Sequence, residues 1–146
     1  MKQIVAYLLL APLVCYGKDL AVYDGSPWWT HATYMFGHAG WLHYFLNGLG
    51  WLMMWRITTS ARTLSAVAVA ALLPPTHLPV LGWSVVIYYY LGLCLAAMPT
   101  GARIRLLMLV GIGFFLPWIA AWHHAGMLAA GWMMRKLERK WERTAY

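Results

Sequence analysis

The residues best suited to chemistry in this sequence are a serine, several histidines and an asparagine that stand within apolar runs. Ser84 stands in one such run, His43 and Asn47 in another, and the pair His123 and His124 in a third. A serine and a histidine that meet in space can act as nucleophile and general base, because the imidazole takes the hydroxyl proton and returns it to the leaving amine. The pattern therefore favours acyl transfer, with Ser84 as the nucleophile.

One of the two adjacent histidines is expected to be the base of this pair. Small residues, Gly126 and Ala130, follow His123 three and seven positions later, and so lie on its helical face. Close packing of two helices is helped by small residues on the facing surface. We therefore favour His123 as the general base, with Gly126 as a supporting packing residue, and keep His124 as the alternative.

Two further polar side chains are candidates for binding an oxyanion. Asn47 and His43 are one helical turn apart and so share a face, from which they could donate to a developing negative charge. The apolar runs contain no Asp or Glu, which predicts a Ser–His dyad without an orienting carboxylate. The same absence argues against an aspartyl protease, and no H-E-x-x-H motif of a zinc protease is present. No metal or other cofactor is expected.

The composition indicates the elements that must carry these side chains. The 146 residues are 62% hydrophobic and 10% charged, whereas a soluble domain has about 25% charged residues. Many of the 10 Trp and 9 Tyr stand near the ends of apolar runs, as in interfacial aromatic belts. We therefore expect an all-α membrane protein with one domain over 1–146. Its predicted transmembrane helices are 3–17, 40–55, 63–74, 79–98, 104–120 and 121–134, followed by a basic tail, 135–146.

The net charge of +7 is distributed in short clusters between these runs. With six spans, every Lys and Arg except Lys18 falls on one side, and the positive-inside rule then places both termini in the cytoplasm. Such clusters favour contact with an anionic lipid bilayer over contact with nucleic acid. The sequence therefore predicts an integral, multi-pass protein of a bacterial inner (plasma) membrane.

Two boundaries in this scheme leave alternatives open. Residues 1–16 could form a signal peptide, but no A-x-A cleavage pattern follows, so we favour a retained first helix. The boundary between the last two runs is also open, and Pro117 with the stretch Trp118–Trp122 marks a turn near an interface there. With these spans, His43, Asn47, Ser84 and His123 lie roughly 5–10 Å below the outer surface, at about 1.5 Å per residue. Ionisable side chains at such depth are rare and indicate a functional site.

The order of the motifs resembles the rhomboid family of intramembrane serine proteases. Residues 36–47 are similar to the second-helix signature H-x-x-x-x-H-x-x-x-N of that family, with His38 as a supporting histidine. Residues 82–84 resemble the start of its G-x-S-G motif, and residues 123–131 resemble its sixth-helix motif H-x-x-G-x-x-x-G. Tyr88 stands where the family commonly has a tyrosine that packs on the catalytic histidine. The resemblance implies supporting roles for Gly82 and Tyr88.

The resemblance implies a six-helix rhomboid-like bundle that works as an intramembrane serine endopeptidase. It would cleave single-span membrane proteins within their transmembrane segments, near the outer face of the bilayer. Val85 replaces the second glycine of the family motif, and this departure favours one alternative, a rhomboid-like pseudoprotease that binds transmembrane helices without cutting them. A second alternative is a haem or metal membrane protein with paired ligands such as His43 and His123.

Overall fold

A computed structural model describes residues 2–116 and 119–144, so Pro117, the predicted boundary, lies outside the described residues. Within the described residues the regular elements are helices, with one isolated β-bridge between Val22 and Val80. In chain order they are α1 (Lys2–Leu8), the 3-10 helix η1 (Ala11–Tyr16), α2 (Gly17–Leu20), α3 (Thr30–Thr33), η2 (Tyr34–Phe36), α4 (Trp41–Met53), α5 (Ser60–Ala71), α6 (Ser84–Cys94), η3 (Leu95–Ala97), α7 (Thr100–Gly113) and α8 (Ala121–Thr144).

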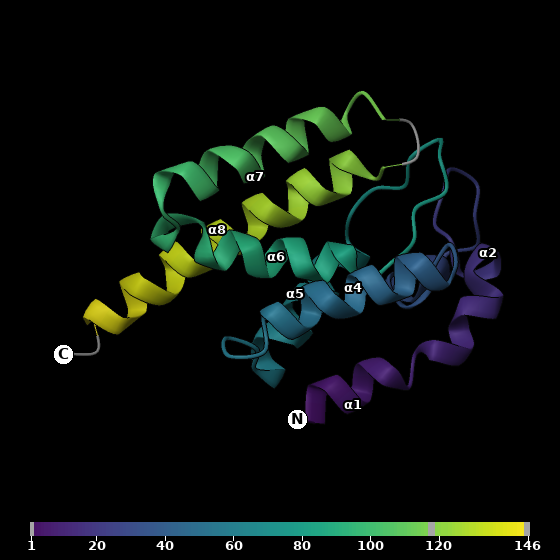
Figure 1. Ribbon diagram of the computed structural model, residues 1–146, viewed down its shortest axis with the longest axis horizontal. Helices are drawn as coiled ribbons and strands as arrows, with labels where there is room; N and C mark the ends of the chain where they lie inside the picture. Colours follow the sequence, from purple (N-terminus) through teal and green to yellow (C-terminus); the bar gives the residue numbers. More distant parts are fainter. Residues whose placement is uncertain (1, 117–118, 145–146) are drawn as a thin grey trace.

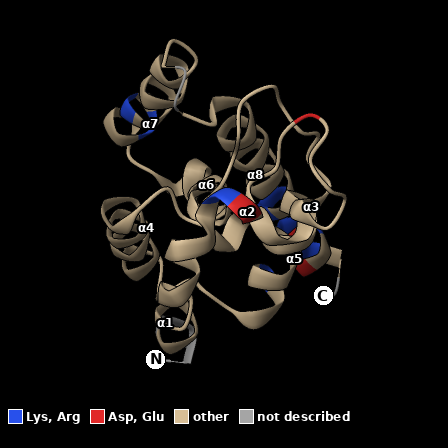
Figure 2. Cartoon of the chain, turned by 90° about the vertical axis from the view of Figure 1, so that its right-hand side faces the viewer, with Lys and Arg blue, Asp and Glu red and all other residues tan. Residues whose placement is uncertain are grey.

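Helix α6 lies in the middle of the bundle. In Figure 1, α4 and α8 flank it, α1 lies beyond α4 and α7 lies beyond α8; α5 contacts both α6 and α8. The end-on view in Figure 2 shows the same helices arranged around α6. This helix has no charged residue, and a helix that is apolar on all sides is stable only when it is buried. Val86, Tyr89 and Tyr90 of α6 are accordingly fully buried.

Two glycines allow α6 and α8 to pack at very short range. A Cβ added to Gly131 of α8 would overlap the carbonyl oxygen of Tyr89, and one added to Gly92 of α6 would overlap the carbonyl oxygen of Leu128. Since neither position tolerates even a methyl group, this contact fixes which face of α8 is turned toward α6. It thereby also fixes which residues at the start of α8 can reach Ser84.

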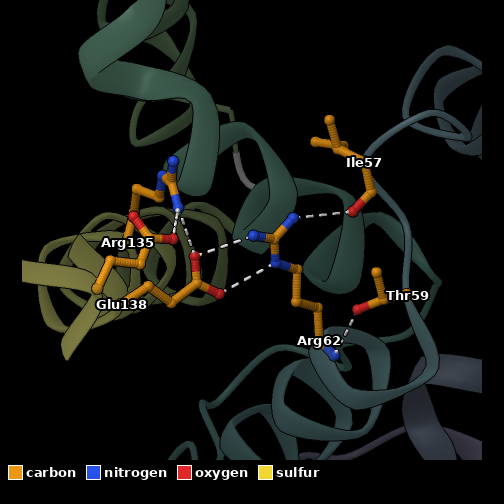
Figure 3. Close-up of polar contacts among 6 residues, drawn as sticks. Ile57, Thr59, Arg62, Arg135 and Glu138 are labelled. Carbon is orange, nitrogen blue, oxygen red and sulfur yellow. Dashed lines mark hydrogen bonds and ion pairs between the residues drawn. The ribbon is translucent and has the colours of Figure 1, made fainter. Parts of the chain in front are cut away.

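An ion-pair network joins the first turn of α5 to the second half of α8 (Figure 3). Arg62 donates from Nε and Nη2 to the two carboxylate oxygens of Glu138 at 3.0 and 2.9 Å. Arg135 donates to the same carboxylate at 2.9 Å, and Arg62 also donates to the Ile57 carbonyl oxygen at 3.2 Å. Thr59 caps α5 by accepting from the Arg62 backbone N–H. The network therefore holds the charged second half of α8 against α5.

The prediction of six membrane-spanning helices is wrong. Among the described residues, no helix is both long and apolar enough to cross a membrane. Helix α7 has 14 residues, or about 21 Å at 1.5 Å per residue, against a hydrocarbon core of about 30 Å. Helix α8 has 24 residues, but its second half is charged. This finding overturns the expected integral, multi-pass membrane protein, its bacterial inner-membrane location and the cytoplasmic placement of both termini.

Hydropathy wrongly predicted one spanning helix for each apolar run, because it depends on composition and does not detect turns of the backbone. The run 3–17 is divided between α1 and η1, and the run 79–98 contains an extended segment and a turn before α6 begins. Gly40 and Gly82, with φ of 148° and 119°, stand just before α4 and α6. Conversely, the run 121–134 continues without a break into the basic tail as far as Thr144, in one helix, α8. Each predicted run therefore contains a helix, but the apolar helices are short.

Candidate functional site

The site begins with the turn that leads into α6. Gly82 has a φ of 119°, a conformation that favours glycine, and its N–H donates to the Tyr34 carbonyl oxygen at 2.9 Å. A Cβ at Gly82 would lie 2.8 Å from His43 Nε2 and 3.4 Å from Asn47 Nδ2. Gly82 therefore lets two side chains of α4 lie directly against the backbone that precedes Ser84. The family resemblance implied a supporting role for Gly82, which stays a prediction.

Ser84 and His124 meet across the α6–α8 contact. Their Oγ and Nε2 atoms are 2.9 Å apart, so the serine hydroxyl donates to the imidazole when Nε2 is unprotonated. Tyr88, one turn after Ser84, stacks on the His124 ring with centroids 4.2 Å apart and planes 12° apart. The ring of Tyr88 thus fixes the plane of the imidazole. Two residues of α6 and one of α8 form the arrangement that a nucleophile and its general base require.

His123, the favoured base, is not the histidine that reaches Ser84. Its side chain is buried and its ring packs edge-on against Tyr34 at 5.8 Å between centroids. Adjacent helical residues point about 100° apart, so only one of the two histidines can face α6. The glycine that sets this face is Gly131, seven residues after His124. Gly126, expected to support the packing on α6, instead adjoins Leu73, 3.3 Å from an added Cβ.

The surroundings of His124 hold it in the form that a general base needs. Burial lowers the pKa of His124 to about 4, and charge repulsion from His123 and His43 adds to the shift. At neutral pH the ring is therefore uncharged and can accept the serine proton. The groups that act on its pKa are other histidines, and no carboxylate is among them. The pair accordingly has the form of a dyad.

His43 and Asn47 provide hydrogen-bond donors beside this dyad. His43 Nδ1 accepts from the Ala39 backbone N–H at 3.2 Å, so in the neutral ring Nε2, which lies near Gly82, carries the proton. The Asn47 side chain is 5% exposed, and its Nδ2 has no hydrogen-bond partner among the described residues. The backbone N–H of Ser84 opens α6 and has no intrahelical acceptor. Three donors thus gather near the Ser84 hydroxyl.

Three further residues, Val85, His38 and Tyr7, are not among these donors or the Ser84–His124 pair. Val85 is 1% exposed and packs in the buried core. His38, predicted as a supporting histidine, contacts His43 and also Tyr7 of α1. No pattern in the sequence connected Tyr7 to the site, because it stands 36 residues before His43 in a separate apolar run. Within the described residues, no group of three His, Cys, Asp or Glu could hold a metal ion.

Comparison of the chain with protein-family models, with curated proteins and with solved structures found no match. The resemblance to rhomboid proteases therefore stays a prediction from the motifs.

Proposed function

We propose that this protein is a serine endopeptidase that hydrolyses peptide bonds through a dyad of Ser84 and His124. The observation that carries the proposal is the 2.9 Å contact between Ser84 Oγ and His124 Nε2. The histidine is uncharged at neutral pH and its ring is fixed by Tyr88. Nucleophilic catalysis by serine needs these features: an adjacent base in its free form, held in one orientation.

The reaction follows from the positions of these groups. Ser84 Oγ attacks the peptide carbonyl carbon while His124 Nε2 takes the hydroxyl proton. Donors on His43, Asn47 and the Ser84 backbone bind the oxyanion of the tetrahedral intermediate. When the intermediate collapses, His124 gives its proton to the leaving amine and an acyl-enzyme remains. Water, activated by His124, then hydrolyses the ester and restores the free serine.

The substrate class follows from the chemistry of the attacked bond. A peptide carbonyl inside a helix is hydrogen-bonded and sterically covered, so the proposed substrate is an extended or locally unwound segment of another protein. The motif resemblance implied cleavage within a membrane, but the spanning helices on which that expectation depended are absent from the described residues. The proposal is therefore limited to hydrolysis of peptide bonds.

The test is hydrolysis of a mixture of unstructured peptides, with the new N-termini identified by mass spectrometry. We expect cleavage by the wild type and none by Ser84→Ala, with folding of both verified by circular dichroism. Cleavage that persists in Ser84→Ala would contradict the assignment of the nucleophile. If the folded wild type binds peptides but cuts none, the pseudoprotease alternative, which the Val85 departure favours, replaces this proposal.

A further inference from the structure

The N-terminal helix is tied to α4 by a pair of tyrosines directly beside the site. The Tyr7 hydroxyl donates to the Tyr44 carbonyl oxygen at 2.6 Å, and the two rings stack with centroids 5.0 Å apart. In return, the Tyr44 hydroxyl lies 3.3 Å from the carbonyl oxygens of Tyr7 and Leu8. Gly48 makes room for this packing, since an added Cβ would lie 3.0 Å from the Tyr7 ring. Tyr7 is consequently 5% exposed and rigidly held.

His38 lies between Tyr7 and His43. It is 1% exposed, and its Nε2 is 3.3 Å from the Tyr7 hydroxyl oxygen. Because the Tyr7 proton is donated to the Tyr44 carbonyl, this hydroxyl can only accept from His38, which places the imidazole proton on Nε2. Burial, followed by repulsion from His43, lowers the pKa of His38 to about 4 against the opposing effect of the Phe36 carbonyl. His38 is therefore neutral at pH 7 and gives its one N–H to Tyr7.

The His38 ring in turn packs against His43. Their centroids are 5.4 Å apart with planes at 67°, an edge-to-face contact that leaves His43 little freedom to rotate. The Ala39 backbone N–H holds Nδ1 of His43 at 3.2 Å. Two contacts of different kinds thus fix the ring whose Nε2 lies against Gly82. Functional side chains keep their geometry only when such supporting contacts lock their rotamers.

We propose that Tyr7 is a positioning residue for the oxyanion-binding side chain His43 and acts through His38. The inference rests on the proposed function, in which the N–H of His43 Nε2 binds the oxyanion. It makes α1 part of the catalytic apparatus, although α1 contributes no group that touches the substrate. Loss of one hydroxyl on α1 should then slow the reaction of Ser84 without changing how well substrate binds.

The experiment measures phosphonylation of Ser84 by a fluorescent fluorophosphonate in the full chain. We expect Tyr7→Phe to lower the maximal labelling rate about 2- to 10-fold, the range for one buried hydrogen bond, with the half-saturating probe concentration unchanged. The matched control is Tyr44→Phe, which removes a hydroxyl from the same α1–α4 contact but leaves the Tyr7–His38 bond in place. We expect the wild-type rate for Tyr44→Phe.

A merely structural role for Tyr7 makes a different prediction for this pair. Thermal unfolding would then show similar losses of stability for both variants, and both would label at equally reduced rates. That result would overturn the proposal. A selective loss of rate in Tyr7→Phe, at equal stability, would support it.

Nuclear magnetic resonance of the histidine rings separates this inference from the proposed function. With ¹⁵N-labelled histidine, we expect His38 in the Nε2-protonated form, and Tyr7→Phe should shift the ring signals of both His38 and His43. Tyr44→Phe should leave them in place. If the wild type is not labelled at Ser84, the proposed function fails, but the ring signals still decide the positioning claim. Unchanged His43 signals in Tyr7→Phe would overturn it.

Discussion

The two ends of the α6–α8 pair carry polar clusters of opposite character. At the charged end, Glu138 accepts three hydrogen bonds from Arg62 and Arg135. Burial alone would raise the pKa of Glu138, but these bonds lower it, so the carboxylate is charged and fully paired. At the other end, Ser84, His124 and Asn47 form an uncharged cluster without a carboxylate. There, the Nδ2 donor of Asn47 has no partner among the described residues.

This difference separates a structural cluster from a candidate functional one. Buried polar groups in folded proteins are almost always hydrogen-bonded, so a group that serves stability alone is expected to be paired. The network of Arg62, Glu138 and Arg135 meets that expectation. A site that binds a transient oxyanion must instead keep donors free until the reaction occurs. If the two clusters have these different roles, a substitution in one of them should leave the other undisturbed.

The largest effect is expected from the two adjacent histidines. His124→Ala should lower peptide hydrolysis on the order of 10⁴-fold or more, because the base of the dyad is lost. His123→Ala is the matched control: the ring lies one residue away but packs on Tyr34, and hydrolysis should continue. Rates of peptide cleavage for the two folded variants are the measurement. A larger loss in His123→Ala would restore the base favoured from the sequence.

The next effect is expected at the glycine contact between α6 and α8. Gly131→Ala should lower the free energy of unfolding by about 3 kcal/mol, because its Cβ overlaps the Tyr89 carbonyl and backbone must shift. Gly111→Ala on α7 is the control, since nothing lies within 4 Å of its Cβ, and it should be neutral or stabilising by up to about 1 kcal/mol. Urea unfolding measures both. Equal stability of the two variants would contradict the close packing.

The buried histidines of the uncharged end should make the stability of the protein depend on pH. The pKa of His38, His123 and His124 is lowered to about 4, so the folded protein binds fewer protons than the unfolded chain between pH 6.5 and 4. Stability should therefore fall as pH falls through this window, by up to about 1.4 kcal/mol per pH unit for each histidine. Urea unfolding at several pH values measures the slope, and His123→Ala should reduce it.

The same shift predicts how the reaction depends on pH. Hydrolysis should be constant near neutral pH and should fall about tenfold per unit once the pH is below about 4, because protonated His124 cannot accept the serine proton. The measurement is the rate of peptide cleavage over the range in which the protein stays folded. A midpoint near the ordinary histidine value would contradict the buried, uncharged environment assigned to His124.

The smallest effect is expected at the charged end. Glu138→Gln should lower the free energy of unfolding by about 1 kcal/mol, because its partners Arg62 and Arg135 are partly exposed. Hydrolysis should be unchanged, because Glu138 lies in the second half of α8 and His124 in its first turn. Glu142→Gln, at a more exposed carboxylate with a single 3.4 Å contact, should change neither quantity. Urea unfolding and peptide cleavage measure these two quantities for both variants. Loss of hydrolysis in Glu138→Gln would show that the two ends are coupled.

The sequence anticipated part of the site because some of its signals are local. The helical spacing of His43 and Asn47 placed both on one face, and the motif around Ser84 pointed to the serine that lies against His124. The choice between His123 and His124 was not local, because it depends on how α8 is rotated against α6. That rotation is fixed by the backbone contact at Gly131, which spacing alone did not reveal.

Other features escaped the sequence for different physical reasons. Hydropathy predicted six spanning helices because it sums apolar residues across turns, whereas the backbone breaks the run 3–17 between α1 and η1 and the run 79–98 at Gly82. Tyr7 carried no signal because its contacts with His38 and Tyr44 are made by residues more than thirty positions away. Long-range contacts of this kind exist only in the assembled bundle.

Activation of Ser84 by His124 can be measured by locating the adduct that a fluorophosphonate forms with the protein. Labelled protein would be digested and the modified residue identified by mass spectrometry, for the wild type, His123→Ala and His124→Ala. We predict one adduct, on Ser84, in the wild type and in His123→Ala, and none in folded His124→Ala. An adduct on Ser84 of equal yield in His124→Ala, or no adduct in the folded wild type, would contradict activation of Ser84 by His124.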